Sequence, residues 1–69
     1  MKLSARNQLK GKIIALEKGA TTSHVSIELA AGAVVMASIT NEAVADLGLA
    51  IGQSATAVIK ASDVMVGVD

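Results

Sequence analysis

Residues 23–39 read SHVSIELAAGAVVMASI, and this stretch decides the fold. From His24 to Leu29 polar and apolar residues alternate strictly, which is the period of a strand with one buried face. Ala31-Gly32 then predicts a tight turn, and the denser apolar run over residues 34–39 predicts a strand covered on both faces. Together these signals predict an antiparallel β-hairpin.

Three further strands are predicted around this hairpin. Residues 12–18 are apolar and β-branched, and they end at Lys18-Gly19, where glycine supports the positive φ of a tight turn. Residues 55–61 again alternate apolar and polar side chains. Residues 64–68 are apolar and β-branched, and their glycine allows a bulge or a close backbone approach.

Between the third and fourth predicted strands the periodicity becomes helical. Thr40 carries a side-chain oxygen that can cap a helix, apolar residues follow at helical spacing, and Gly48 supplies a stop signal, which predicts a short helix over residues 41–47. We therefore expect one all-β domain over residues 1–69, an OB-like five-stranded Greek-key barrel with one short helix. Closure of such a barrel removes open sheet edges.

The composition predicts an oligomer. A chain of 69 residues buries only about 60% of the surface that its unfolded form exposes, yet 52% of these residues are hydrophobic and none is aromatic. Such an excess of small apolar side chains favours burial at subunit interfaces. With no cysteine and a single histidine, His24, disulfides and a directly coordinated metal are not expected.

The charges are unevenly distributed although the net charge is zero. Residues 1–18 carry five cations and one carboxylate, a net charge of +4, whereas residues 19–69 carry one cation and five carboxylates, a net charge of −4. Either this is scattered surface charge, or the N-terminal segment faces an anion. The longest near-apolar stretch, residues 29–37, is about half the length needed to span a bilayer. We therefore expect a soluble, cytoplasmic chain that does not associate with a membrane.

Catalysis and nucleic-acid binding have little support. Nucleophilic catalysis needs a base close to the nucleophile, and we interpret His24, the only imidazole, as a surface strand residue. Single-strand binders rely on aromatic stacking, and the chain has no Phe, Tyr or Trp. The sequence therefore predicts neither an enzyme nor a nucleic-acid partner.

Three short polar clusters have the chemistry to bind a small oxyanion. One is the N-terminal stretch Ser4-Ala5-Arg6-Asn7, one is Lys60-Ala61-Ser62, and the third is Thr40 at the predicted helix N-terminus. Guanidinium, ammonium, hydroxyl and backbone N–H groups all donate hydrogen bonds to anions. The alternative is structural: Ser4 and Thr40 cap local backbone, Arg6 pairs with Asp63 or Asp69, and Lys60 lies in solvent.

At these same residues the sequence resembles the molbindin family, the small molybdenum-pterin-binding (Mop) proteins. The resemblance lies in residues 4–11 (SARNQLKG), 37–40 (ASIT), 47–49 (LGL) and 57–65 (AVIKASDVM). It implies an OB-like barrel assembled as a homo-hexamer, a trimer of dimers, that binds molybdate or tungstate at subunit interfaces as an intracellular store. The same domain occurs in molybdate-responsive regulators, so a molybdate-sensing module that acts through a protein partner is the alternative function.

The resemblance also implies site residues. The molybdate contacts would be Ser4, Ala5, Arg6, Asn7, Thr40, Lys60, Ala61 and Ser62. Related regulator domains can carry a serine where this chain has Ala43, so one hydroxyl is missing or is replaced by a backbone N–H. A second oxyanion site would lie on the turn Lys18, Gly19, Ala20, Thr21 and Thr22, whose alternative role is only to close a hairpin.

Overall fold

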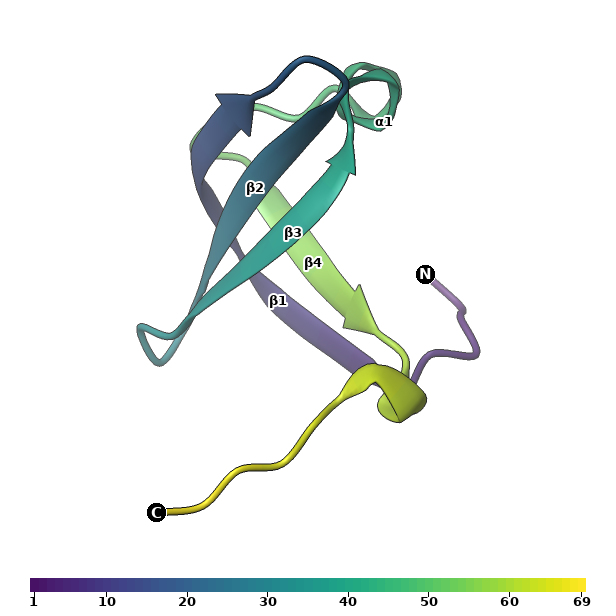
Figure 1. Ribbon diagram of the computed structural model, residues 1–69, viewed down its shortest axis with the longest axis vertical. Coiled ribbons are helices and arrows are strands. Elements are labelled where there is room, and N and C mark those ends of the chain that lie inside the picture. The colour runs from purple at the N-terminus through teal and green to yellow at the C-terminus, as the bar shows by residue number, and fades with distance from the viewer.

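A single curled antiparallel sheet makes up most of the molecule. The computed structural model covers residues 1–69 and contains β1 (Asn7–Lys18), β2 (Thr22–Leu29), β3 (Val34–Thr40) and β4 (Ser54–Ile59). The strand order is β3-β2-β1-β4 (Figure 1). Three consecutive strands pair through hairpins and the fourth returns to lie beside the first, which is the Greek-key arrangement that we expected.

The hairpin of residues 23–39 forms as predicted, but its second strand is not covered on both faces, because Val34 and Met36 are exposed. β2 and β3 pair in a regular register from Thr22 opposite Thr40 to Glu28 opposite Val34, and Gly32 turns the chain with φ of 91°. The alternation places Val25 and Ile27 in the core, whereas His24 and Glu28 are exposed.

β1 is longer than the sequence predicted. It begins at Asn7 instead of residue 12, because residues 7–12 pair with β4. The register of β1 against β2 shifts between Ile13 and Ala15. This bulge leaves Ile13 fully buried while Ile14, the next residue, is 42% exposed. Gly11 is required just before the bulge, because a Cβ there would collide with the carbonyl oxygen of Glu28.

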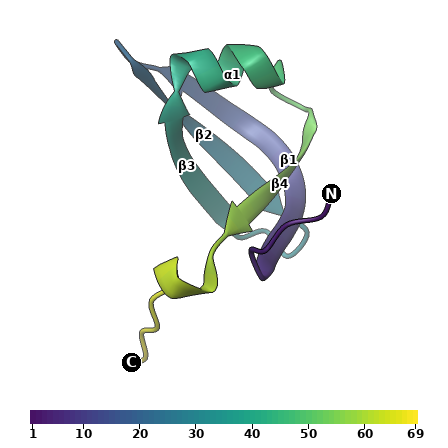
Figure 2. The same ribbon diagram turned by 90° about the vertical axis from the view of Figure 1, so that its right-hand side faces the viewer.

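Helix α1 (Asn41–Leu47) also forms with the predicted bounds. The Thr40 hydroxyl oxygen accepts the Ala43 N–H at 3.0 Å, and Gly48 ends the helix in the left-handed region with φ of 61°. The helix lies across one end of the sheet (Figure 2). Val44 packs there against the core.

The predicted fifth strand over residues 64–68 is wrong for the isolated chain. After β4 the chain makes one 3₁₀ turn, Ala61–Asp63, and then continues to Asp69 without pairing to any strand. A strand forms only where an edge accepts it, and this segment leaves the body of the molecule (Figures 1 and 2). The sheet therefore curls without closing between β3 and β4.

The core is small. Its buried apolar side chains are Ile13, Val25, Ile27 and Ala57, and the one buried polar residue is Ser23. By contrast, thirteen large hydrophobic residues are exposed. The structure contains no helix with the length and apolarity needed to cross a membrane.

Candidate functional site

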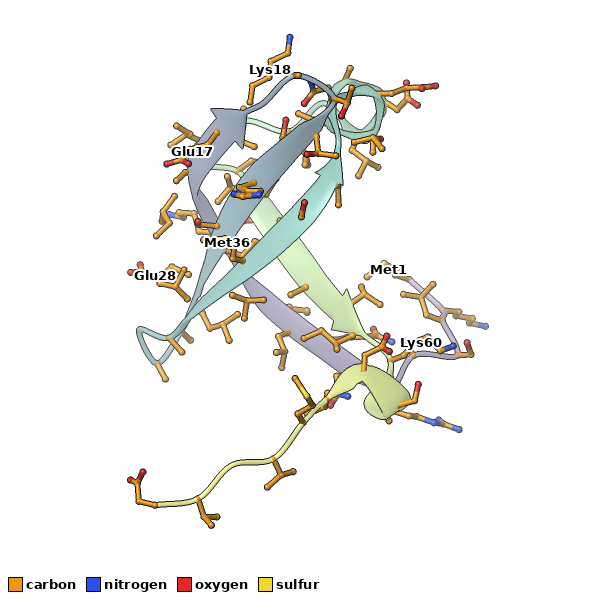
Figure 3. All side chains as sticks on the ribbon, viewed as in Figure 1. Met1, Glu17, Lys18, Glu28, Met36 and Lys60 are labelled. Atoms are coloured by element: carbon orange, nitrogen blue, oxygen red, sulfur yellow. The ribbon has the colours of Figure 1, made fainter.

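Pairing of β1 with β4 brings two of the three predicted donor clusters together. Asn7 lies opposite Ile59, and its side-chain amide donates to the Ile59 carbonyl oxygen at 3.2 Å. This pairing places residues 4–7 and residues 60–62 at the same end of the sheet, although more than fifty residues separate them in the sequence. In Figure 3, Lys60 lies at the end of β4, at the same end of the sheet as the start of β1. We call this set the Arg6–Lys60 cluster, and it consists of Ser4, Ala5, Arg6, Asn7, Lys60, Ala61 and Ser62.

Most donors of the Arg6–Lys60 cluster are exposed and make no side-chain hydrogen bond. The side-chain hydrogen bonds of the chain use none of Ser4, Arg6, Lys60 and Ser62, all of which are exposed. The predicted alternative, a cap made by Ser4, is not observed. A guanidinium, an ammonium and two hydroxyls thus lie at one end of the sheet, and donors of these kinds suit a small polyvalent anion.

Thr40 does not join this cluster within one chain. It ends β3 at the opposite end of the sheet, paired with Thr22. β1 is 12 residues long, so up to roughly 35 Å of extended strand separates the two ends. The Thr40 oxygen caps α1, as the structural alternative predicted, yet its O–H hydrogen can still be donated. The hydroxyl oxygen thus accepts one hydrogen bond that holds the helix, and its hydrogen remains available for donation to a ligand.

Ala43 has no hydroxyl where a serine would carry one. Its backbone N–H is the group that Thr40 accepts, at 3.0 Å. This N–H is therefore already used within the chain, and the choice between a missing hydroxyl and a backbone replacement stays a prediction.

The predicted second site lies in a turn that is largely satisfied by its own hydrogen bonds. The Gly19 N–H donates to the Thr22 carbonyl at 2.7 Å, and the Asn41 side-chain amide donates to the carbonyls of Gly19 and Ala20 at 3.0 and 3.3 Å. The Asn41 N–H adds a bond to the Thr21 carbonyl at 2.9 Å. These contacts support the reading that the turn closes a hairpin.

A shallow hollow of about 240 Å³ nevertheless opens beside this turn. Glu17, Lys18, Gly19, Thr22 and His24 line it. The Lys18 ammonium favours an anion, whereas the Glu17 carboxylate, which lies opposite His24 across the two strands, opposes one. The electrostatics of this hollow are therefore mixed.

The sequence did not indicate the role of Asn41. Its side-chain oxygen accepts the hydroxyl of Ser23, which is only 3% exposed, while its amide holds the turn. One side chain thereby joins β2, the turn and α1. In the sequence, Asn41 stands out only as an amide residue next to a helix cap. That position does not indicate hydrogen-bond partners that lie 18 to 22 residues earlier in the chain.

Comparison with known proteins gives a consistent result. Residues 3–66 match the family model of the TOBE domain. The chain is 46% identical over 69 residues to a probable molybdenum-pterin-binding protein of Haemophilus influenzae, with all of both chains covered. It is 53% identical over 66 residues to the molybdenum transport protein ModE of Herbaspirillum seropedicae, covering 96% of this chain and 24% of ModE.

The fold is shared with solved structures as well. The cytoplasmic molybdate-binding protein ModG, solved with molybdate bound, superposes with a TM-score of 0.95 at 48% identity, covering 100% of this chain and 49% of ModG. The Arg6–Lys60 cluster lies within the matched region.

Proposed function

The chain belongs to the TOBE-domain family and to its molybdenum-pterin-binding branch, and from this premise we propose that it binds molybdate, or tungstate, as a non-enzymatic cytoplasmic store. The observation that carries the proposal is the Arg6–Lys60 cluster, whose exposed cationic and hydroxyl donors lie at one end of the sheet without hydrogen-bond partners in the chain. Molybdate is a dianion whose four oxygens accept hydrogen bonds. Arg6 and Lys60 neutralise its charge, and Ser4 and Ser62 supply hydroxyl donors.

The site lies between subunits. Thr40 is at the far end of the sheet from the Arg6–Lys60 cluster, so an anion that takes donors from both must contact two copies of the chain. Thirteen exposed large hydrophobic residues supply the apolar surface for such an assembly. We propose a homo-hexamer, a trimer of dimers, with molybdate at its interfaces and a second, weaker anion site at the turn of residues 18–22.

Physical reasoning connects ligand and assembly. An anion that binds only to the oligomer stabilises it by mass action, and in its absence cations from neighbouring copies repel each other. Discrimination against sulfate rests on the larger size of molybdate, because only the larger anion reaches donors that are fixed on two chains. No covalent bond is made or broken.

Calorimetric titration with molybdate tests this proposal, with sulfate and phosphate as controls and with light scattering of the same sample. We expect selective molybdate binding by a particle of six chains. Equal heats for sulfate, or no heat for molybdate, contradict an oxyanion store. A particle of another size contradicts the hexamer alone.

A molybdate-sensing module is the second candidate, because a region similar to this chain also forms part of a larger protein, the molybdenum transport protein ModE, of which the match covers 24%. A sensor acts through a protein partner, so its outer surface must capture that partner in a ligand-dependent manner. Storage instead requires high capacity without any partner. Binding of one defined protein only in the presence of molybdate would select the sensing role.

A further inference from the structure

The hollow beside the turn of residues 18–22 contains an ionisable side chain that the second anion site, as proposed above, does not include. This side chain is His24, which lies on β2 directly opposite Glu17 of β1. Lys18 is the third ionisable residue of the lining. All three side chains are exposed, and none of them makes a side-chain hydrogen bond. Their polar atoms are therefore accessible to a ligand.

The charge of His24 decides the net charge of this hollow. The Lys18 ammonium and the Glu17 carboxylate cancel, so the lining has a net charge of zero when the imidazole is neutral and of +1 when it is protonated. Histidine is the side chain that ordinarily changes its charge between about pH 5 and about pH 8. A cationic lining attracts an anion, whereas a neutral lining does not.

No other ionisable residue lines the hollow. The residue opposite His24 on β3 is Ser38, and neither β3 nor β4 contains an ionisable residue. The remaining ionisable residues of β1, β2 and α1, all outside the lining, are Lys10, Lys12, Glu28, Glu42 and Asp46. The electrostatics of the hollow are thus set by the three side chains that line it.

We propose that His24 is a further anion-binding residue of the second site, and that protonation of its imidazole strengthens this site. The inference rests on the proposed function, because the ligand is the same molybdate dianion. A protonated imidazole has two N–H donors and one positive charge, whereas a neutral imidazole has one donor and no charge. Since the side chain is exposed to solvent, the gain in affinity is modest, about twofold. The second site therefore fills more readily as the pH falls.

The same coupling must act on the proton. If protonated His24 binds molybdate more tightly, bound molybdate holds the proton on His24 by the same factor. Loss of this proton then requires a higher pH when molybdate is bound. A twofold coupling raises the midpoint of the His24 titration by about 0.3 pH units.

Proton NMR of the full chain in heavy water measures this midpoint directly. His24 is the only histidine, and the chain has no Phe, Tyr or Trp, so the two ring C–H signals of His24 are its only aromatic side-chain signals. At saturating molybdate we expect the midpoint to lie about 0.3 pH units above its value in sodium chloride of equal ionic strength. An unchanged or lowered midpoint overturns the role of His24.

Calorimetric titration with molybdate at about pH 6 and about pH 8 gives an independent test. In the unmodified chain, the second binding step should be about twofold tighter at the lower pH. His24→Gln keeps a polar side chain that cannot be protonated, so its second step should lose this difference. The same variant controls for the α-amino group of Met1 and for the acid–base chemistry of molybdate itself. His24→Lys carries its charge at both pH values and should bind tightly at both.

The two binding steps distinguish failure of this inference from failure of the proposed function. If His24→Gln shows the same pH response as the unmodified chain, or if no second step occurs at either pH, the role of His24 is wrong. The first step, at the Arg6–Lys60 cluster, then still supports the proposed function. Absence of both steps overturns the proposed function and the inference together.

Discussion

The two ends of the sheet use the same kinds of polar side chain in opposite ways. At the turn–helix end, which comprises Ser23, Thr40, Asn41 and the turn of residues 19–22, the side chains of Ser23, Thr40 and Asn41 all make hydrogen bonds within the chain. In the Arg6–Lys60 cluster at the other end, Ser4, Arg6, Lys60 and Ser62 make none.

From this difference we infer that the turn–helix end holds the fold, whereas the donors of the Arg6–Lys60 cluster remain available to a ligand. A buried polar group must be paired because its desolvation is otherwise uncompensated, and the Ser23 hydroxyl is buried and paired. An exposed donor is solvated by water and costs little when unpaired, so it can be kept for a ligand. Mutations at the turn–helix end should therefore change stability, and mutations in the Arg6–Lys60 cluster should change binding.

The largest effect is expected from Asn41→Ala. It removes the two amide bonds to the turn and leaves the buried Ser23 hydroxyl without its acceptor. We expect the free energy of unfolding to fall by about 3 kcal/mol, measured by urea denaturation. Asn41→Asp is the matched control because it keeps the acceptor for Ser23 and loses only the donors, so about half of the loss should remain. Equal losses in the two variants would contradict the importance of the Ser23 bond.

Arg6→Ala should have the opposite profile. We expect molybdate affinity to fall by about 2 kcal/mol, roughly 30-fold, because a hydrogen bond between charged groups is lost, while the free energy of unfolding stays within about 0.5 kcal/mol. Calorimetric titration and urea denaturation measure the two quantities.

Lys12→Ala is the control for Arg6→Ala. It removes the same charge from an exposed position on β1 that lies outside both candidate sites, opposite Glu28 and Ser54. Its molybdate affinity should match that of the unmodified chain. If Lys12→Ala weakens binding as much as Arg6→Ala does, net charge rather than the Arg6–Lys60 cluster attracts the anion.

Local signals predicted those parts of the molecule that local interactions decide. The hairpin of residues 23–39 and helix α1 follow from alternation, a threonine cap and Gly48, and both formed with the predicted bounds or within one residue of them. The first half of β1 was missed because Gly11 between two lysines gives no strand pattern. Its strand conformation depends on pairing with β4, more than forty residues away.

The fifth strand and the position of Thr40 were not predicted correctly, because both depend on contacts between residues far apart in the sequence. Residues 64–68 have the composition of a strand, but a strand also needs a sheet edge to pair with. Composition does not indicate which sheet edge that would be. Thr40 shares its donor chemistry with Ser4 and Ser62, yet the register places it at the far end of the sheet. The sequence therefore predicted which side chains can donate hydrogen bonds, but it did not predict which residues lie next to each other in the fold.

A smaller effect is expected at Thr40, where the two roles meet in one side chain. Thr40→Ala should lower the free energy of unfolding by about 1 kcal/mol through loss of the helix cap. It should also weaken molybdate binding by about fivefold, because one neutral hydroxyl donor is lost. Thr40→Ser keeps the hydroxyl oxygen and its hydrogen and should restore both quantities. A loss of stability without any loss of affinity would assign Thr40 to the cap alone.

The smallest effect is expected at the turn of residues 18–22, where an anion site and a closed hairpin lead to different results. Lys18 and Glu17 line the same hollow with opposite charges, and both are exposed, so each contributes only about 0.5 kcal/mol to anion binding. In a calorimetric titration that resolves a second, weaker binding step, Lys18→Ala should weaken that step about twofold. Glu17→Gln should strengthen it by a similar factor, because it removes an opposing carboxylate without changing the size of the side chain. Opposite changes in the affinity of this second step in the two variants would identify an anion site. A turn that only closes a hairpin would give no second binding step in the titration of either variant.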